Sequence, residues 1–81
     1  MRVIIIVEFG EILYHAQTLG YDWNDMHDKL SPLLPWPGEA TRGIDYSEVE
    51  LDQIKLPEDA KKVLMSFMEI NSLRSFELTA E

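Results

Sequence analysis

Two histidines and several acidic side chains are the residues of this chain whose types and spacing suit chemistry. His15 lies in a segment with helical periodicity, and Glu11 precedes it by four residues, which would place the two side chains on neighbouring turns of one helix face. A histidine oriented by a carboxylate is the arrangement of a general base. No serine, threonine or cysteine is tied to His15 by a recognisable motif, which favours an ordinary helix histidine over a catalytic one.

A second cluster contains Asp22, Asp25, His27 and Asp28, and groups rich in carboxylate oxygen bind calcium or magnesium. The EF-hand pattern is missing, because its glycine at the sixth loop position and its glutamate at the twelfth are both absent. Asp22 suits the N-cap of a helix instead, with Asp25 at the third helical position. We therefore expect no metal. Since the chain also lacks a glycine-rich phosphate loop and a nucleophile motif, we expect no cofactor and no enzymatic activity.

Residues 31–43 hold three prolines and two glycines, and we predict a loop there. Trp36 stands in it between two prolines. A side chain held in this way loses little entropy on docking, and tryptophan and arginine are typical interface anchors. We therefore predict that Trp36 contacts a partner, with Leu34 and Arg42 beside it. The alternative is that Trp36 folds back over the small core.

The acids of the chain are concentrated in residues 45–59, where Lys55 is the single base. Within this stretch, acidic residues alternate with Ser47, Val49 and Leu51, and a period of two predicts a one-sided strand over residues 44–56. The carboxylates of such a strand point to one side and would form a row that docks a basic surface, with Glu77 as a further neighbour. The acids predicted to bind the partner are Asp45, Glu48, Glu50 and Asp52.

Two alternatives to this acidic docking strand remain open. The acids also suit the solvated face of an edge strand, where charge deters aggregation. Ser47 with Glu50 three residues later fits a capping box, which would make the segment a helix.

The overall charge narrows the class of partner. Of the 81 residues, 15 are acidic and 7 are basic, giving a net charge of −8. We therefore expect no direct binding to nucleic acid or to an anionic membrane, and a basic protein as the partner. The chain has no cysteine and no apolar run near the ~20 residues of a membrane span. With no signal peptide visible, we expect a cytoplasmic protein.

The most apolar stretch is residues 2–9, with five β-branched residues in a row. Such a run predicts a strand buried on both faces, so we expect it at the centre of the sheet. Helices on one side would cover one of its faces, and a partner chain is a candidate to cover the other.

The remaining elements follow from periodicity. We expect helices over residues 11–19, from Asp22 to Leu30, and from Pro57 to the region of Asn71, and a final strand over residues 74–80. The order β-α-α-β-α-β predicts one α/β domain over residues 1–81, with a sheet of about three strands and helices on one face.

These observations predict a non-enzymatic, acidic protein-interaction module, an inhibitor that docks a basic, nucleic-acid-binding surface of its partner. The first alternative is a structural subunit or homodimer that associates through the central strand and the Trp36 loop. The second is a small enzyme or metal-binding protein built around His15 and residues 22–28.

Overall fold

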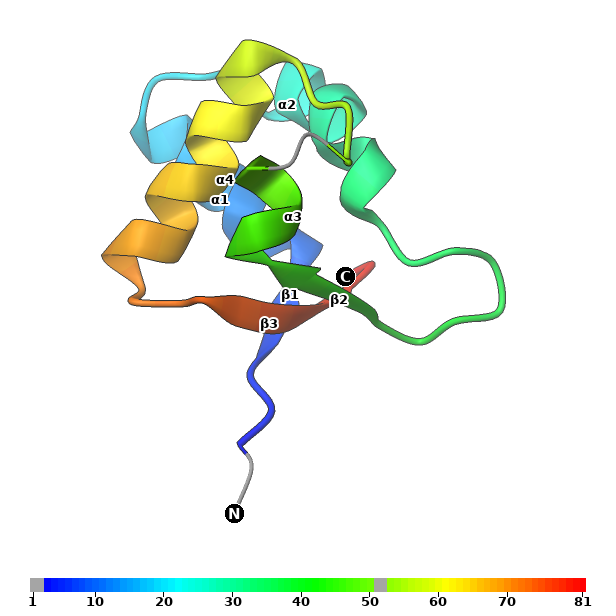
Figure 1. Cartoon of the computed structure of the whole chain (residues 1–81). Coiled ribbons are helices and arrows are strands. Elements are labelled where there is room, and N and C mark those ends of the chain that lie inside the picture. Colours follow the sequence, from blue (N-terminus) through cyan, green and yellow to red (C-terminus); the bar gives the residue numbers. More distant parts are fainter. Residues whose placement is uncertain (1–2, 51–52) are drawn as a thin grey trace.

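The computed structural model describes residues 3–50 and 53–81 and shows an α+β fold, with a three-stranded mixed sheet and helices on one of its faces (Figure 1). The predicted class and order β-α-α-β-α-β are confirmed, with α3 as an additional short helix. The elements are β1 (Ile6–Glu8), α1 (Phe9–Thr18), α2 (Trp23–Leu30), the 3-10 helix η1 (Ser31–Leu33), β2 (Arg42–Asp45), α3 (Tyr46–Glu50), α4 (Glu58–Ile70) and β3 (Ser75–Thr79).

The centre of the sheet is β3, since the strand order is β1-β3-β2. β1 runs parallel to β3 and β2 antiparallel to it. Phe76 and Leu78 of β3 are buried, together with Val7 of β1 and Ile44 of β2. Because side chains alternate along a strand, these four residues form the layer on which the helices pack. The final strand predicted over residues 74–80 is therefore confirmed, with the bounds Ser75–Thr79.

The prediction that residues 2–9 form the central strand is wrong. β1 covers three residues at the edge of the sheet, and position 2 lies outside the described residues. The register places Ile6 beside Glu77, so Ile4 lies level with Ser75, where β3 begins. Residues before Ile4 thus have no strand beside them. Of the five β-branched residues, only Ile6 and Val7 lie in β1, and of these only Val7 is buried.

The prediction of a strand over residues 44–56 is also wrong, because the strand β2 ends at Asp45 and the helix α3 begins at Tyr46. The Asp45 carboxylate accepts hydrogen bonds from the Ser47 hydroxyl and, at 3.0 Å, from the Glu48 backbone N–H. An aspartate that accepts such bonds starts a helix. This local cap outweighs the alternation of the residues that follow. The capping-box alternative indicated a helix correctly, but the cap is Asp45.

The longer helices follow their sequence signals. Glu8 and Glu11 form a capping box at the start of α1. Asp22 caps α2, its carboxylate accepting the Asp25 N–H at 2.9 Å. Gly20, between these helices, has φ +95°, a conformation that glycine adopts without strain. The helix α4 presents one apolar stripe to the core, and all of its residues are buried. They are Ala60, Val63, Leu64, Phe67 and Met68.

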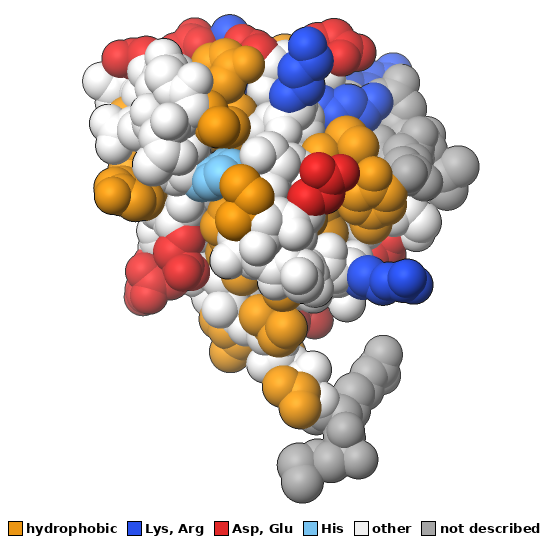
Figure 2. Space-filling view, turned by 90° about the vertical axis from the view of Figure 1, so that its left-hand side faces the viewer, with side chains coloured by type: hydrophobic (Ala, Val, Ile, Leu, Met, Phe, Trp, Pro, Cys, Tyr) orange, Lys and Arg blue, Asp and Glu red, His pale blue; other side chains and the backbone are white. Residues whose placement is uncertain are grey.

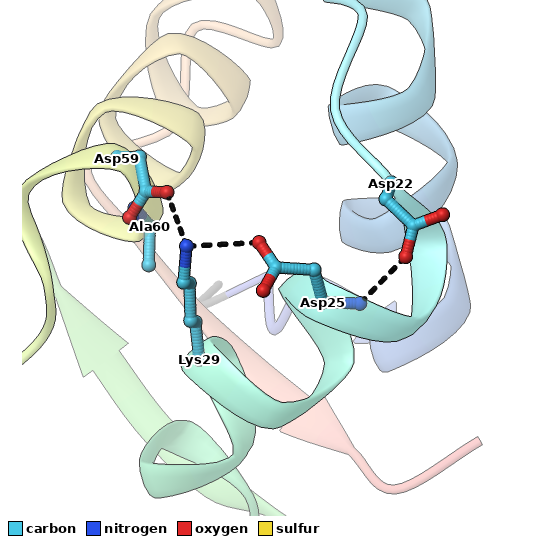
Figure 3. Close-up of polar contacts among 5 residues, drawn as sticks. All are labelled: Asp22, Asp25, Lys29, Asp59 and Ala60. Atoms are coloured by element: carbon cyan, nitrogen blue, oxygen red, sulfur yellow. Dashed lines mark hydrogen bonds and ion pairs between the residues drawn. The ribbon is translucent and has the colours of Figure 1, made fainter.

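Lys29 ties α2 to α4 (Figure 3). Its Nζ lies 2.8 Å from Asp25 Oδ2 and 2.6 Å from Asp59 Oδ2. Hydrogen bonds to Asp25 and then to Asp59 raise the pKa of Lys29. The bond from Lys29 likewise lowers the pKa of Asp59. The charged forms of Lys29 and Asp59 therefore support the packing of α2 against α4.

We expect Lys29→Met to lower the melting temperature at neutral pH, and to lower it less below about pH 4. The lowered pKa of Asp59 means that its ionised form stabilises the fold above the unfolded aspartate pKa. That stabilisation is lost as the pH falls through the folded value. Thermal melts of the wild type and Lys29→Met across this range test the point, with the exposed Lys62→Met as a control. An effect of Lys29→Met that is independent of pH would assign the loss to packing.

Candidate partner-binding surface

Among the described residues, one face of the sheet carries no helix. Figure 1 shows the labelled helices on one side of the sheet and the N-terminal part of the chain projecting away from them. Because Val7, Ile44, Phe76 and Leu78 point toward the helices, the residues between them point the other way. We call this surface the open face, and it consists of Ile6, Glu8, Gly43, Asp45, Ser75, Glu77 and Thr79.

A shallow groove of about 420 Å³ lies at one end of the open face. Its carboxylates come from Asp45, Glu48 and Glu77, and within the described residues no lysine or arginine lines it. The lining residues are Val3, Ile4, Ile5, Gly43, Ile44, Asp45, Glu48, Ser75, Phe76 and Glu77. The groove therefore combines apolar and acidic residues, which suits a partner with both apolar and basic side chains.

Two of the three carboxylates have defined surroundings. The Ser47 hydroxyl and the Glu48 backbone N–H hold the pKa of Asp45 below its usual range, so this group stays charged near neutral pH. Glu77 lies opposite Gly43 on the neighbouring strand. A Cβ placed at Gly43 would lie 3.6 Å from Glu77 Oε1, an ordinary van der Waals distance, so the Glu77 carboxylate lies close over Gly43 of β2.

Beside the groove lies an apolar stretch, residues 3–6, which we call the N-terminal segment. The exposed fractions of its side chains are 79% for Val3, 66% for Ile4, 43% for Ile5 and 62% for Ile6. Figure 2 shows hydrophobic side chains on the part of the chain that projects below the body. Contiguous apolar surface of this kind next to charged residues is typical of a protein–protein contact.

The structure separates the acids that the sequence placed in one row. Asp45 and Glu48 line the groove together with Glu77, the expected neighbour. Glu50 belongs to α3 and not to a strand, and Asp52 lies outside the described residues. The predicted row is therefore wrong, while part of it contributes to an acidic surface built from β2, α3 and β3.

The predicted site at Trp36 is a separate surface. Trp36 begins a turn in which the Glu39 N–H donates to its carbonyl oxygen at 2.9 Å, with Gly38 at φ +92°. The pattern of proline followed by glycine in this turn is that of a type II turn. Trp36 is 65% exposed, so the alternative that it covers the core is wrong. Leu34 does pack against the core.

Arg42 holds the loop in place. Its guanidinium donates to the Pro32 carbonyl oxygen, and its Cζ lies 5.9 Å from the centre of the Trp36 ring. Arg42 and Asp45 occupy opposite ends of β2, about 10 Å apart along the strand. The predicted binding residues are thus divided between a Trp36–Arg42 surface and the acidic groove.

We expect Trp36→Ala to change the free energy of unfolding by less than about 1 kcal/mol, because an exposed cation–π contact is the main interaction lost. Urea denaturation measures this directly. If Trp36 is an interface anchor, the same variant weakens association with a partner. A destabilisation of several kcal/mol would show that the ring is a structural part of the fold.

The sequence did not identify the nearest side-chain partner of His15. The imidazole Nε2 lies 3.0 Å from the Ser66 hydroxyl of α4, and the His15 ring meets Phe67 edge-on at 5.8 Å. The Glu11 carboxylate accepts the Glu8 N–H at 2.7 Å, which is a capping role. The His15–Ser66 pair therefore reads as a link between α1 and α4. Ser66 lies next to the buried stripe of α4, and this placement was the sequence signal that Ser66 faces another helix.

Across residues 3–50 and 53–81, no three histidine or acidic side chains are grouped to hold a metal ion. In the same part of the chain, no helix has the length and apolar character needed to cross a membrane. Comparison with protein-family models, with curated proteins and with solved structures finds no match to this chain in any of the three.

Proposed function

We propose that this chain is a non-enzymatic protein-interaction module that binds a basic partner through the open face and the N-terminal segment. The observation that carries the proposal is the pairing of two features in one groove. The groove is lined by the apolar residues Val3, Ile4 and Ile5 and by the acidic residues Asp45, Glu48 and Glu77, with no basic residue in the part of its lining that the structure describes.

These two features contribute in different ways. Burial of apolar surface is worth roughly 25 cal/mol per Å² and gives lasting affinity. Uncompensated carboxylates mainly steer a cationic partner and raise its association rate. The net charge of −8 acts in the same direction. Where the partner's basic surface is one that binds nucleic acid, the chain acts as an inhibitor by occupying it.

A peptide of alternating lysine and valine residues is a suitable probe, with a peptide of alternating glutamate and valine as its control. Titration into isotope-labelled protein should shift the backbone resonances of Ile5, Gly43 and Glu77 with the lysine peptide only. The resonances of the Trp36 loop should move little. Absence of binding, or equal binding of both peptides, would contradict the proposal.

Self-association is the second candidate, favoured by the exposure of residues 3–6. A homodimer that covers this apolar segment would also have to bring two chains of charge −8 together. Such a dimer should tighten or stay unchanged as salt is added, whereas binding of the lysine peptide should weaken. Sedimentation at two protein concentrations and two salt concentrations separates these outcomes.

A further inference from the structure

One hydrogen-bonding edge of β1 pairs with no strand in residues 3–50 and 53–81. In a parallel pair, the N–H and C=O groups of alternate residues point to the same neighbour. The Ile5 carbonyl accepts the Glu77 N–H at 2.8 Å, so the groups of Ile5 point toward β3. Those of Ile4 and Ile6 then point outward, where no strand lies within the part of the chain that the structure describes.

Natural proteins usually protect such an edge with a charge, a proline, a bulge or a covering element. β1 is short and ends in the charged Glu8, but the segment that leads into it, Val3 to Ile6, carries only apolar side chains, each at least 43% exposed. An edge of this kind serves to receive a strand from another chain, as in recognition by β-strand addition.

We infer that the partner contributes an extended segment that pairs with β1 as a fourth strand of the sheet. This inference rests on the proposed function and specifies how the basic partner is held. The main-chain groups of Ile4 and Ile6 bond to the segment, and alternate side chains of the segment lie on the open face.

The charge on the open face determines the chemistry of those side chains. An added strand lies about 4.8 Å from β1 and about 10 Å from β3. Its side chains on the open face therefore lie next to Ile6 and Glu8. The aliphatic part of a lysine or arginine there packs on Ile6, and its charged end can extend across β1 toward Glu77. Its other side chains continue the layer that contains Val7 and are apolar. The segment that fits thus alternates basic and apolar residues.

Ile6→Pro removes the outward N–H of Ile6, which pairs with nothing in the described fold, and proline is tolerated on an edge strand. Ile6→Val keeps that N–H and is the matched control. We expect Ile6→Pro to weaken binding of the lysine–valine peptide roughly tenfold, and Ile6→Val to leave it nearly unchanged. The amide spectrum of β3 reports whether Ile6→Pro is folded.

A second measurement changes the peptide and leaves the protein intact. The lysine–valine peptide with N-methyl groups on alternate backbone nitrogens keeps its charges but loses one edge of donors. It should bind the wild type roughly tenfold more weakly than the unmodified peptide. If the methylated peptide and Ile6→Pro both bind as well as their controls while the open-face shifts persist, strand addition is wrong and the proposed function stands. If the unmodified peptide does not bind, both fail.

Discussion

Replacing Leu78 with alanine should destabilise the protein by about 2–5 kcal/mol, a large share of the stability of so small a domain. Leu78 is fully buried in the central strand and lies beside Val7 on one side and Arg42 on the other. Its removal leaves a cavity where all three strands meet the helices. Domains of this size are marginally stable, so the variant should be largely unfolded near its working temperature. Urea denaturation monitored by circular dichroism gives the value.

Ile5→Ala is the matched comparison, because it removes a similar volume from an edge position that is 43% exposed. We expect a smaller loss of roughly 1 kcal/mol, since nearly half of the deleted surface already faces water and no closed cavity is left. Equal losses for Leu78→Ala and Ile5→Ala would mean that the N-terminal segment is buried, contrary to the structure.

The acidic groove gives the second large effect. The triple variant Asp45→Asn, Glu48→Gln and Glu77→Gln keeps the shape of the groove and removes three charges. Asparagine at position 45 retains an oxygen acceptor, so the cap of α3 is preserved. At low ionic strength we expect the association rate of the lysine–valine peptide to fall tenfold or more. The remaining binding should depend less on salt, because fewer charges are left to screen.

A second triple variant controls for net charge. Asp28→Asn, Glu39→Gln and Glu69→Gln removes three exposed acids from outside the groove. It should lower the association rate much less, since charges beyond a Debye length of the docking site are screened. Stopped-flow measurement of both triples at two salt concentrations decides the matter. Equal slowing by the two triples would show that the overall charge attracts the peptide and that the groove is not its site.

Local signals in the sequence determined most of the helices. The cap at Asp22, the left-handed glycine at position 20 and the stripe of α4 act over a few residues, and each is found in the structure. The alternation in residues 75–79 likewise identified β3 as a half-buried strand. Elements of this kind depend on contacts within a turn or a strand, so a single sequence suffices to predict them.

The position of a strand within a sheet depends on contacts between distant residues, and there the sequence misled. The β-branched run before Val7 indicated the centre of the sheet. The central strand is instead the less apolar β3, which pairs with both β1 and β2. At residues 45–50, alternation and capping competed, and the Asp45 cap prevailed. The sequence could not predict that Asp45 and Glu77 belong to one acidic groove, because only the pairing of β2 with β3 brings these distant residues close together.

The proposed partner-binding surface depends most on the N-terminal segment being an open edge. Site-resolved amide exchange in the free protein tests this directly. The Glu77 N–H is bonded to the Ile5 carbonyl inside the sheet, so we expect it to exchange among the slowest amides. The outward-facing amides of Ile4 and Ile6 should exchange at rates near those of an unprotected chain. If Ile4 and Ile6 exchanged as slowly as Glu77, the segment would be paired within the fold, and the surface proposed for the partner would not exist.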